Sequence, residues 1–158
     1  MGYGTFFSIF LIIMFGVSLA VFAQPDLEYE NIFMRHITVK DGLSQRTVND
    51  ILKDTQGFIW IATDNGLNRF DGNEFHTYIN ENDDSTSISE NGIHDLFEDS
   101  KNRLWVGTNH FGLNLFDRTT EEFKRYLFDP DDDNSISESS VTSMIEDTDG
   151  MLWIGSGG

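Results

Sequence analysis

The stretch that decides the fold is Asp54-Thr55-Gln56-Gly57-Phe58-Ile59-Trp60-Ile61-Ala62-Thr63, followed by a second run from Asn65 to Gly72. An acidic residue, a glycine three positions later, a tryptophan three positions after that and an apolar run predict a tight turn and a short strand. The second run predicts another strand, joined to the first by a short turn. The same pattern returns from Asp99 to Trp105 and from Asp147 to Trp153, so the chain contains a repeated element.

The repeat has a period typical of a β-propeller. Trp60 and Trp105 are 45 residues apart, and Trp105 and Trp153 are 48 residues apart. Each copy contains short apolar runs bounded by Gly, Asp, Asn or Ser, which predict strands. In the first copy these runs are Val48–Leu52, Phe58–Thr63, Gly66–Phe70 and Phe75–Ile79. Repeated groups of four antiparallel strands predict an all-β fold of propeller blades.

The spacing Asp-x-x-Gly-x-x-Trp predicts a turn and a packed ring. The Asp can accept N–H bonds from the turn backbone, and the glycine can adopt a positive φ, as can the Asn that replaces it in the second copy. The repeated tryptophans predict packing between neighbouring blades, with ligand stacking as the alternative. The structural positions of the repeat are Asp54, Gly57, Trp60, Asp99, Asn102, Trp105, Asp147, Gly150 and Trp153.

The fourth strand of the first copy has an irregular pattern. Phe75 and Tyr78 are three positions apart, so an unbroken strand cannot place both on one face. We expect either a bulge in this strand or a role for one of the two rings on the outer face.

Composition excludes several classes of function. The 158 residues are 39% hydrophobic and 23% charged, which is ordinary globular composition, and the formal net charge is −17. Such a charge repels phosphate backbones, so no nucleic-acid partner is expected. The chain has no cysteine and contains no Gly-x-Ser-x-Gly elbow, P-loop or His-Glu-x-x-His motif. We expect no catalytic residue, no metal site and no cofactor in this chain.

The N-terminal residues 1–23 predict an export segment, because they are almost entirely apolar from Phe6 to Ala23. Small residues at Val21 and Ala23 fit the cleavage site of a signal peptide before Gln24. Residues 1–5 contain no Lys or Arg, and this leaves a membrane anchor as the alternative. Residues 24–32 predict a linker. Both alternatives place the rest of the chain in the periplasm or elsewhere outside the cytoplasm.

Two groups of polar residues are candidates for ligand binding. Asp129, Asp131 and Asp133 alternate as in a calcium loop, but the loop lacks the motif's glycine and final acid. We expect a solvated loop there, with calcium binding as the alternative. Polar groups beside aromatic residues suit sugar hydroxyls, and the candidates for this role are Arg69, Asn109, His110 and Arg125.

From residue 33 to the C-terminus the chain resembles the two-component regulator propeller repeat family. In the first copy the resemblance is carried by Asp41-Gly42-Leu43-Ser44, Asp54 to Thr63, Asn65 to Gly72 and Phe75-His76-Thr77-Tyr78. Ala62 departs from the family pattern, which usually has a glycine there. In that family the repeat lies in the extracytoplasmic sensor region of hybrid histidine kinases, many of which control polysaccharide utilisation.

The resemblance implies a domain organisation for residues 33–158. Residues 33–39 are expected to form a strand like the fourth strand of a blade, one that pairs with the last blade to close the ring. Residues 44–79 and 89–127 are expected to be blades, and residues 137–158 part of a third. Such a ring is incomplete, so we expect the chain to be an N-terminal fragment of a longer protein.

The resemblance also implies a function. The chain would sense a glycan or oligosaccharide as part of a homodimeric membrane receptor, and would pass the signal to a histidine kinase that the chain lacks. A secreted propeller glycosidase or lyase is one alternative. A propeller sensor with a transcription-regulator or cyclic-dinucleotide output is another.

Overall fold

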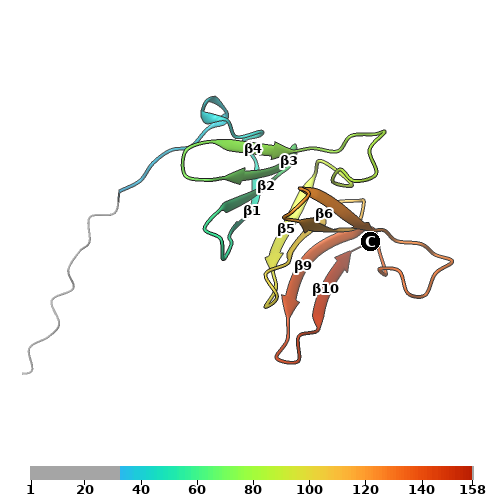
Figure 1. Ribbon diagram of the computed structural model, residues 1–158. Helices are drawn as coiled ribbons and strands as arrows, with labels where there is room; N and C mark the ends of the chain where they lie inside the picture. The colour runs from blue at the N-terminus through green and yellow to red at the C-terminus, as the bar shows by residue number, and fades with distance from the viewer. Residues whose placement is uncertain (1–32, 158) are drawn as a thin grey trace, which may run out of the picture. The chain divides into compact units, whose positions relative to one another are not determined.

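The computed structural model describes residues 33–157, which form an all-β structure with one short 3-10 helix (Figure 1). The chain divides into two parts, Met1–Met34 and Arg35–Gly158, and the fold below is that of the second. The predicted export segment (1–23) and linker (24–32) lie outside the described residues. Within residues 33–157, no helix is long and apolar enough to cross a membrane.

Three successive repeats build the structure. The first is a four-stranded antiparallel sheet of β1 (Val48–Lys53), β2 (Ile59–Thr63), β3 (Gly66–Phe70) and β4 (Phe75–Tyr78). The second has the same order, with β5 (Ile93–Glu98), β6 (Leu104–Thr108), β7 (Leu113–Asp117) and β8 (Glu122–Tyr126). The third contributes the hairpin of β9 (Ser140–Glu146) and β10 (Leu152–Gly157). This confirms the predicted all-β blade architecture.

The connections alternate between the two edges of each sheet that are formed by the strand ends, because neighbouring strands run antiparallel. One edge carries the β1–β2, β5–β6 and β9–β10 turns. Each of these turns contains the Asp-x-x-Gly-x-x-Trp pattern, with Asn in place of Gly in the second repeat; we call this pattern the box and this edge the box edge. The opposite edge carries the β2–β3 and β6–β7 turns and the long β4–β5 and β8–β9 connections; we call it the cleft edge. The two edges therefore expose different sets of side chains.

The predicted bulge in the fourth strand is wrong, and the alternative of a ring on the opposite face is confirmed. Strand β4 pairs with β3 without interruption from Tyr78 to Phe75. Tyr78 is buried in the core, whereas Phe75 stacks on Phe70 with ring centroids 4.6 Å apart. The register shifts lie in the first strand of each repeat, for example between Val48 and Asp50.

The segment 33–39, expected to be a strand, is not one here. Residues 33–38 have no regular structure, and the 3-10 helix η1 (Val39–Asp41) begins where the strand was expected to end. Thr38 caps this helix through its side chain. A strand needs a neighbouring strand for its backbone hydrogen bonds, and the described residues give this segment none. Its pairing with a last blade stays a prediction.

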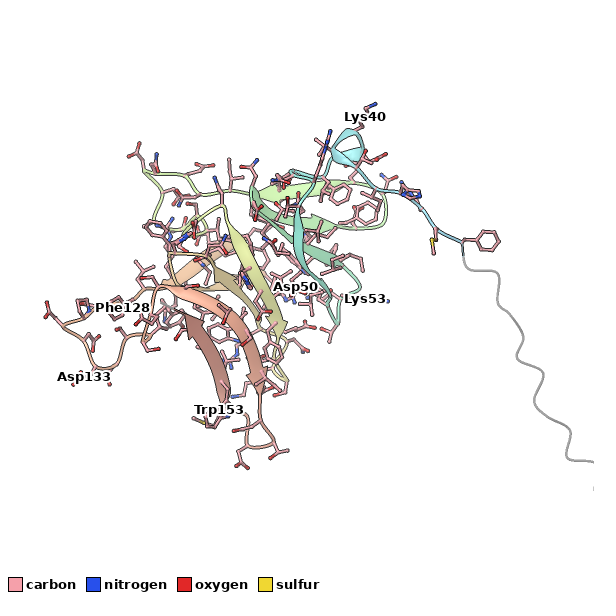
Figure 2. All side chains as sticks on the ribbon, turned by 180° about the vertical axis from the view of Figure 1, so that it is seen from behind. Lys40, Asp50, Lys53, Phe128, Asp133 and Trp153 are labelled. Atoms are coloured by element: carbon pink, nitrogen blue, oxygen red, sulfur yellow. The ribbon has the colours of Figure 1, made fainter. Side chains whose placement is uncertain are left out.

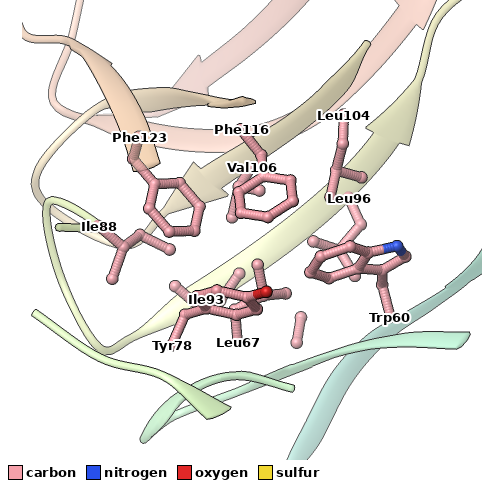
Figure 3. Packing of buried hydrophobic residues seen from close by; sticks show 11 residues of the cluster. Trp60, Leu67, Tyr78, Ile88, Ile93, Leu96, Leu104, Val106, Phe116 and Phe123 are labelled. Carbon is pink, nitrogen blue, oxygen red and sulfur yellow. The ribbon is translucent and has the colours of Figure 1, made fainter. Parts of the chain in front are cut away.

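The main core lies between the first and second repeats. It consists of apolar side chains from both sheets, including Trp60 and Tyr78 from the first and Phe116 and Phe123 from the second (Figure 3). Trp60 is completely buried, and its ring lies 5.1 Å from that of Phe116 in an edge-to-face arrangement. A smaller core around Trp105 and Val141 joins the second repeat to the third. The first and second repeats thus each bury their tryptophan against the repeat that follows.

Candidate ligand-binding cleft

The Asp of each repeat shapes the turn at the box edge, as predicted. In the first repeat Asp54 Oδ1 accepts hydrogen bonds from the backbone N–H groups of Gln56 (3.0 Å) and Phe58 (2.9 Å). Asp99 and Asp147 make the equivalent pairs of bonds in the second and third repeats. The turn residue is left-handed in all three repeats, with φ 95° at Gly57, 60° at Asn102 and 79° at Gly150. The Asp and the left-handed residue therefore shape this turn in all three repeats.

Each box also contains a hydrogen bond that the sequence did not reveal. The indole N–H of Trp60 donates to Asp54 Oδ2 at 2.8 Å, and the same bond measures 2.9 Å in the second repeat and 2.7 Å in the third. Burial raises the pKa of Asp54, but the hydrogen bonds from Trp60 and Arg118 outweigh it and hold the pKa below its ordinary value. The carboxylate is thus used to hold the indole and the turn.

A cleft of about 700 Å³ opens at the cleft edge between the first and second repeats. Its walls come from the β2–β3 turn, the β4–β5 connection, the β6–β7 turn and the end of β8. Its volume lies in the range usual for small-molecule sites. The side chains that matter most for its chemistry are Asp64, Asn82, Glu90, Asn109, Phe111 and Arg125.

Backbone hydrogen bonds fix the walls of the cleft. The N–H of Gly66 donates to the carbonyl of Asn91 at 2.7 Å, and the N–H of Asn109 donates to the carbonyl of Gly92 at 3.0 Å. Gly66 has φ 107°, a conformation that side chains disfavour. Asn80 braces the β4–β5 connection by donating from its side chain to the carbonyl of Ile88 at 2.7 Å. The cleft is therefore preformed by contacts between two repeats.

The cleft combines polar groups with one exposed aromatic ring. The side-chain amides of Asn82 and Asn109 make no hydrogen bond to the residues that the structure describes. Phe111 is 55% exposed and lies in the β6–β7 turn, next to Gly112. Amides that can donate and accept, beside an apolar ring, suit a ligand with both hydroxyl groups and an apolar face.

The structure brings three of the four predicted ligand-binding residues to this region. Asn109 and Arg125 line the cleft. His110 lies beside it, where its backbone N–H donates to Glu90 at 2.7 Å and its ring Nδ1 lies 3.1 Å from the same carboxylate. Arg125 also has a structural task, because Nε donates to the carbonyl of Ser87 at 2.8 Å and holds the β4–β5 connection. The ligand-binding role of these residues stays a prediction.

Arg69 is not among the residues that line the cleft. Its guanidinium pairs with Glu121 at 2.7 Å and lies 5.1 Å from the centre of the Phe58 ring. This hydrogen bond lowers the pKa of Glu121 despite partial burial. Sequence reasoning missed Asp64, Asn82, Glu90 and Phe111. The signal that could have found Phe111 is an aromatic residue within a polar, glycine-containing turn.

The acidic loop before the third repeat uses two of its carboxylates for local turns. Asp129 Oδ1 accepts from the N–H of Asp131 at 3.0 Å, and Asp132 Oδ1 accepts from the N–H of Asn134 at 2.9 Å. Across residues 33–157, no group of three or more His, Cys, Asp or Glu residues has an arrangement that could hold a metal ion. Calcium binding by this loop stays the alternative to a solvated loop.

The repeats match a known family. The family described as two-component regulator propeller matches residues 42–65, 87–110 and 135–158, one match for each repeat. All three repeats of this chain thus match the two-component regulator propeller family. The first two matched segments run from the residues before the first strand, through the box, to the turn after the second strand, and the third includes β9, the box and β10. The matches therefore cover the first two strands of each repeat and the turn that joins them.

Relatives of these propeller repeats occur in sensor proteins. The chain is 44% identical over 78 residues to histidine kinase P4 of Formosa agariphila, a match that spans 48% of this chain and 6% of the kinase. It is similar to a solved structure from B. thetaiotaomicron, described as the extracellular domain of a hybrid two-component system, with 33% identity and a TM-score of 0.70. That match covers 76% of this chain and 17% of the solved domain.

A second solved structure from B. thetaiotaomicron, described as the extracellular domain of a one-component system, has 26% identity and a TM-score of 0.61. Its match covers 76% of this chain and 17% of that domain. The propeller chain thus spans a small part of each relative.

Proposed function

We propose that this chain is part of the ligand-sensing propeller of a two-component sensor and lies on the extracytoplasmic side of a membrane. Its family assignment and its likeness to extracellular domains of two-component systems support this role. The histidine kinase among its relatives supports a kinase as the output of the whole protein. A transcription-regulator output is the second candidate, because one solved structure of a relative is described as part of a one-component system, although another structure of that relative is described as part of a hybrid two-component system. The chain itself acts by binding and not by catalysis.

The proposed ligand is a neutral glycan or oligosaccharide, and the cleft is its proposed site. The observation that carries this proposal is the preformed cleft in which the Asn82 and Asn109 amides lie beside the exposed ring of Phe111. Sugar hydroxyls pair with amides, and the apolar face of a sugar ring packs on an aromatic ring. Asp64 and Glu90 in the cleft, and the chain's net charge of −17, favour a neutral sugar over an anionic one.

The cleft suggests how binding becomes a signal. Its walls belong to two repeats, so a ligand that contacts both walls stabilises one packing of the repeats over another. The difference would be transmitted through the propeller to the receptor dimer and across the membrane. The homodimer and the membrane connection are parts of this proposal.

Calorimetric titration of the complete exported receptor region with a panel of neutral and acidic oligosaccharides tests the proposal. We expect binding of at least one neutral oligosaccharide, and at least tenfold weaker binding after Phe111→Ala or Asn109→Ala. The matched control is Phe128→Ala, because Phe128 is 40% exposed but does not line the cleft. This control should leave the affinity unchanged.

Two outcomes would contradict the proposal in different ways. Binding of no glycan at all would reject the ligand class. Glycan binding that is insensitive to Phe111→Ala and Asn109→Ala would keep the ligand class but reject this cleft as the site.

A further inference from the structure

Neighbouring repeats are joined at the box edge by a pair of hydrogen bonds to one glutamate, and this pair occurs at the same place in both interfaces. Thr55 donates to Glu98 through its backbone N–H (2.8 Å) and its hydroxyl (2.9 Å). Ser100 donates to Glu146 through its backbone N–H (2.7 Å) and its hydroxyl (2.9 Å). In both cases the donor follows the box Asp of one repeat, and the glutamate precedes the box Asp of the next. We call this pair of bonds the clasp.

The clasp depends on the chemical type of the residue before the box Asp. An ionised glutamate has two oxygens that only accept, so it can take an N–H and an O–H together. A lysine at that position has only donors and would face two further donors. In the first interface Arg118 also donates to Glu98 at 2.8 Å, which fixes the carboxylate in place. The clasp thus distinguishes an acidic from a basic residue in the following repeat.

The third repeat presents the donor half of a further clasp. Thr148 follows the box Asp there, is exposed, and has no hydrogen-bond acceptor among the described residues. The surrounding surface is apolar, since Ile145, Met151 and Trp153 are each at least 63% exposed. Figure 2 shows Trp153 on this sheet. The corresponding residues of the first repeat, Leu52, Phe58 and Trp60, pack in the core against the second repeat.

The first repeat presents a different residue on its opposite face. Lys53 precedes Asp54 at the place where Glu98 and Glu146 stand in the other repeats (Figure 2). Val48 and Ile51 of the same strand are 39% and 61% exposed, so this face could supply apolar contacts to a neighbour. In a second copy of the chain docked on the third repeat, however, the ammonium group of Lys53 would meet the donors of Thr148.

We propose that the exposed face of the third repeat binds another repeat of this family that carries a glutamate directly before its box Asp. Lys53 excludes the first repeat of a second copy from that place. Head-to-tail contacts between identical chains that do not close would build open filaments, and Lys53 opposes them. The inference follows from continuity with the two interfaces already formed, and it does not depend on the ligand proposed for the cleft.

Lys53→Glu is the direct test, because it converts the first repeat into a glutamate-bearing one. We expect this variant to self-associate in sedimentation velocity, with an association constant at least tenfold above that of the unmodified chain. Amide hydrogen exchange at Thr148 should slow at least tenfold as its concentration rises. The matched control is Lys40→Glu, which makes the same charge change at an exposed lysine of η1 and should change neither quantity.

Three results would overturn the proposal. These are association of Lys53→Glu no stronger than that of Lys40→Glu, association of Lys53→Glu without protection of Thr148, and association of the unmodified chain with protection of Thr148. The existing clasp provides a second test that needs no association. Glu146→Lys should speed amide exchange at Ser100 at least tenfold and leave Thr55 unchanged, and equal exchange at Ser100 in both chains would reject the recognition rule.

Discussion

Trp60 and Trp153 occupy the same position in the first and third repeats, yet their surroundings are opposite. Both indole N–H groups donate to the box Asp, at 2.8 Å and 2.7 Å. Trp60 is completely buried under the second repeat, whereas Trp153 is 64% exposed. The hydrogen bond therefore belongs to the repeat itself, and the burial is supplied by the neighbour. A repeat of this kind therefore forms its own turn and hydrogen bonds, but it needs a neighbouring repeat to bury its apolar surface.

The largest expected difference between the two positions comes from removing the rings. Trp60→Ala should lower the free energy of unfolding by about 3–5 kcal/mol, because it leaves a cavity in the core between two repeats. Trp153→Ala should cost about 1 kcal/mol or less, since little burial is lost. Urea unfolding of both variants measures the difference. Equal losses would mean that the rings stabilise their own repeats and not the interface.

Removing the box carboxylate should give the next largest difference. Asp54→Ala leaves the buried indole N–H and two turn N–H groups without their acceptor, and removes a 2.6 Å ion pair with Arg118. The expected loss of unfolding free energy is about 3 kcal/mol. Asp147→Ala, at the exposed box of the third repeat, should lose clearly less. Thermal unfolding of the two variants checks this order, which a larger loss for Asp147→Ala would reverse.

The smallest expected effect concerns Asp95, on the first strand of the second repeat. Burial and the neighbouring Asp50 carboxylate raise the pKa of Asp95 to about 6, and its Oδ2 has no hydrogen-bond partner among the described residues. Because the pKa is raised on folding, the contribution of Asp95 to stability is present below pH 3.8 and is lost as the pH rises through 6.

Asp95→Asn removes this titration while keeping the shape of the side chain. The variant should be more stable than the unmodified chain at pH 7.5 by on the order of 1 kcal/mol, after allowance for solvent screening, and the difference should shrink toward pH 4. Urea unfolding at several pH values measures it. A difference that does not change with pH would show that the Asp95 carboxyl titrates normally.

The sequence predicts the strands and box turns well, because the signals for them are local. Alternating apolar residues and a turn glycine or Asn102 act within a few positions, and their repetition multiplies the signal. The bond between Asp54 and the Trp60 indole was not predicted, because it depends on how the turn folds the two side chains together.

The cleft could be predicted only in part, for a related reason. Asn109 and Arg125 attract notice as polar residues near aromatic ones, but Asp64 and Glu90 join them only through the packing of two sheets. Arg69 looked similar in the sequence, yet its place on β3 directs it to the Phe58 ring and Glu121. Contacts between repeats decide which polar residues share a site, and no single repeat contains that information.

The central claim is that each repeat depends on its neighbour to bury its tryptophan. It is tested most directly by acrylamide quenching and emission of two single-tryptophan forms of the chain. Trp105→Phe with Trp153→Phe retains Trp60, and Trp60→Phe with Trp105→Phe retains Trp153. We predict blue-shifted, weakly quenched emission from Trp60 and red-shifted, strongly quenched emission from Trp153. Equal protection of the two rings would contradict the account.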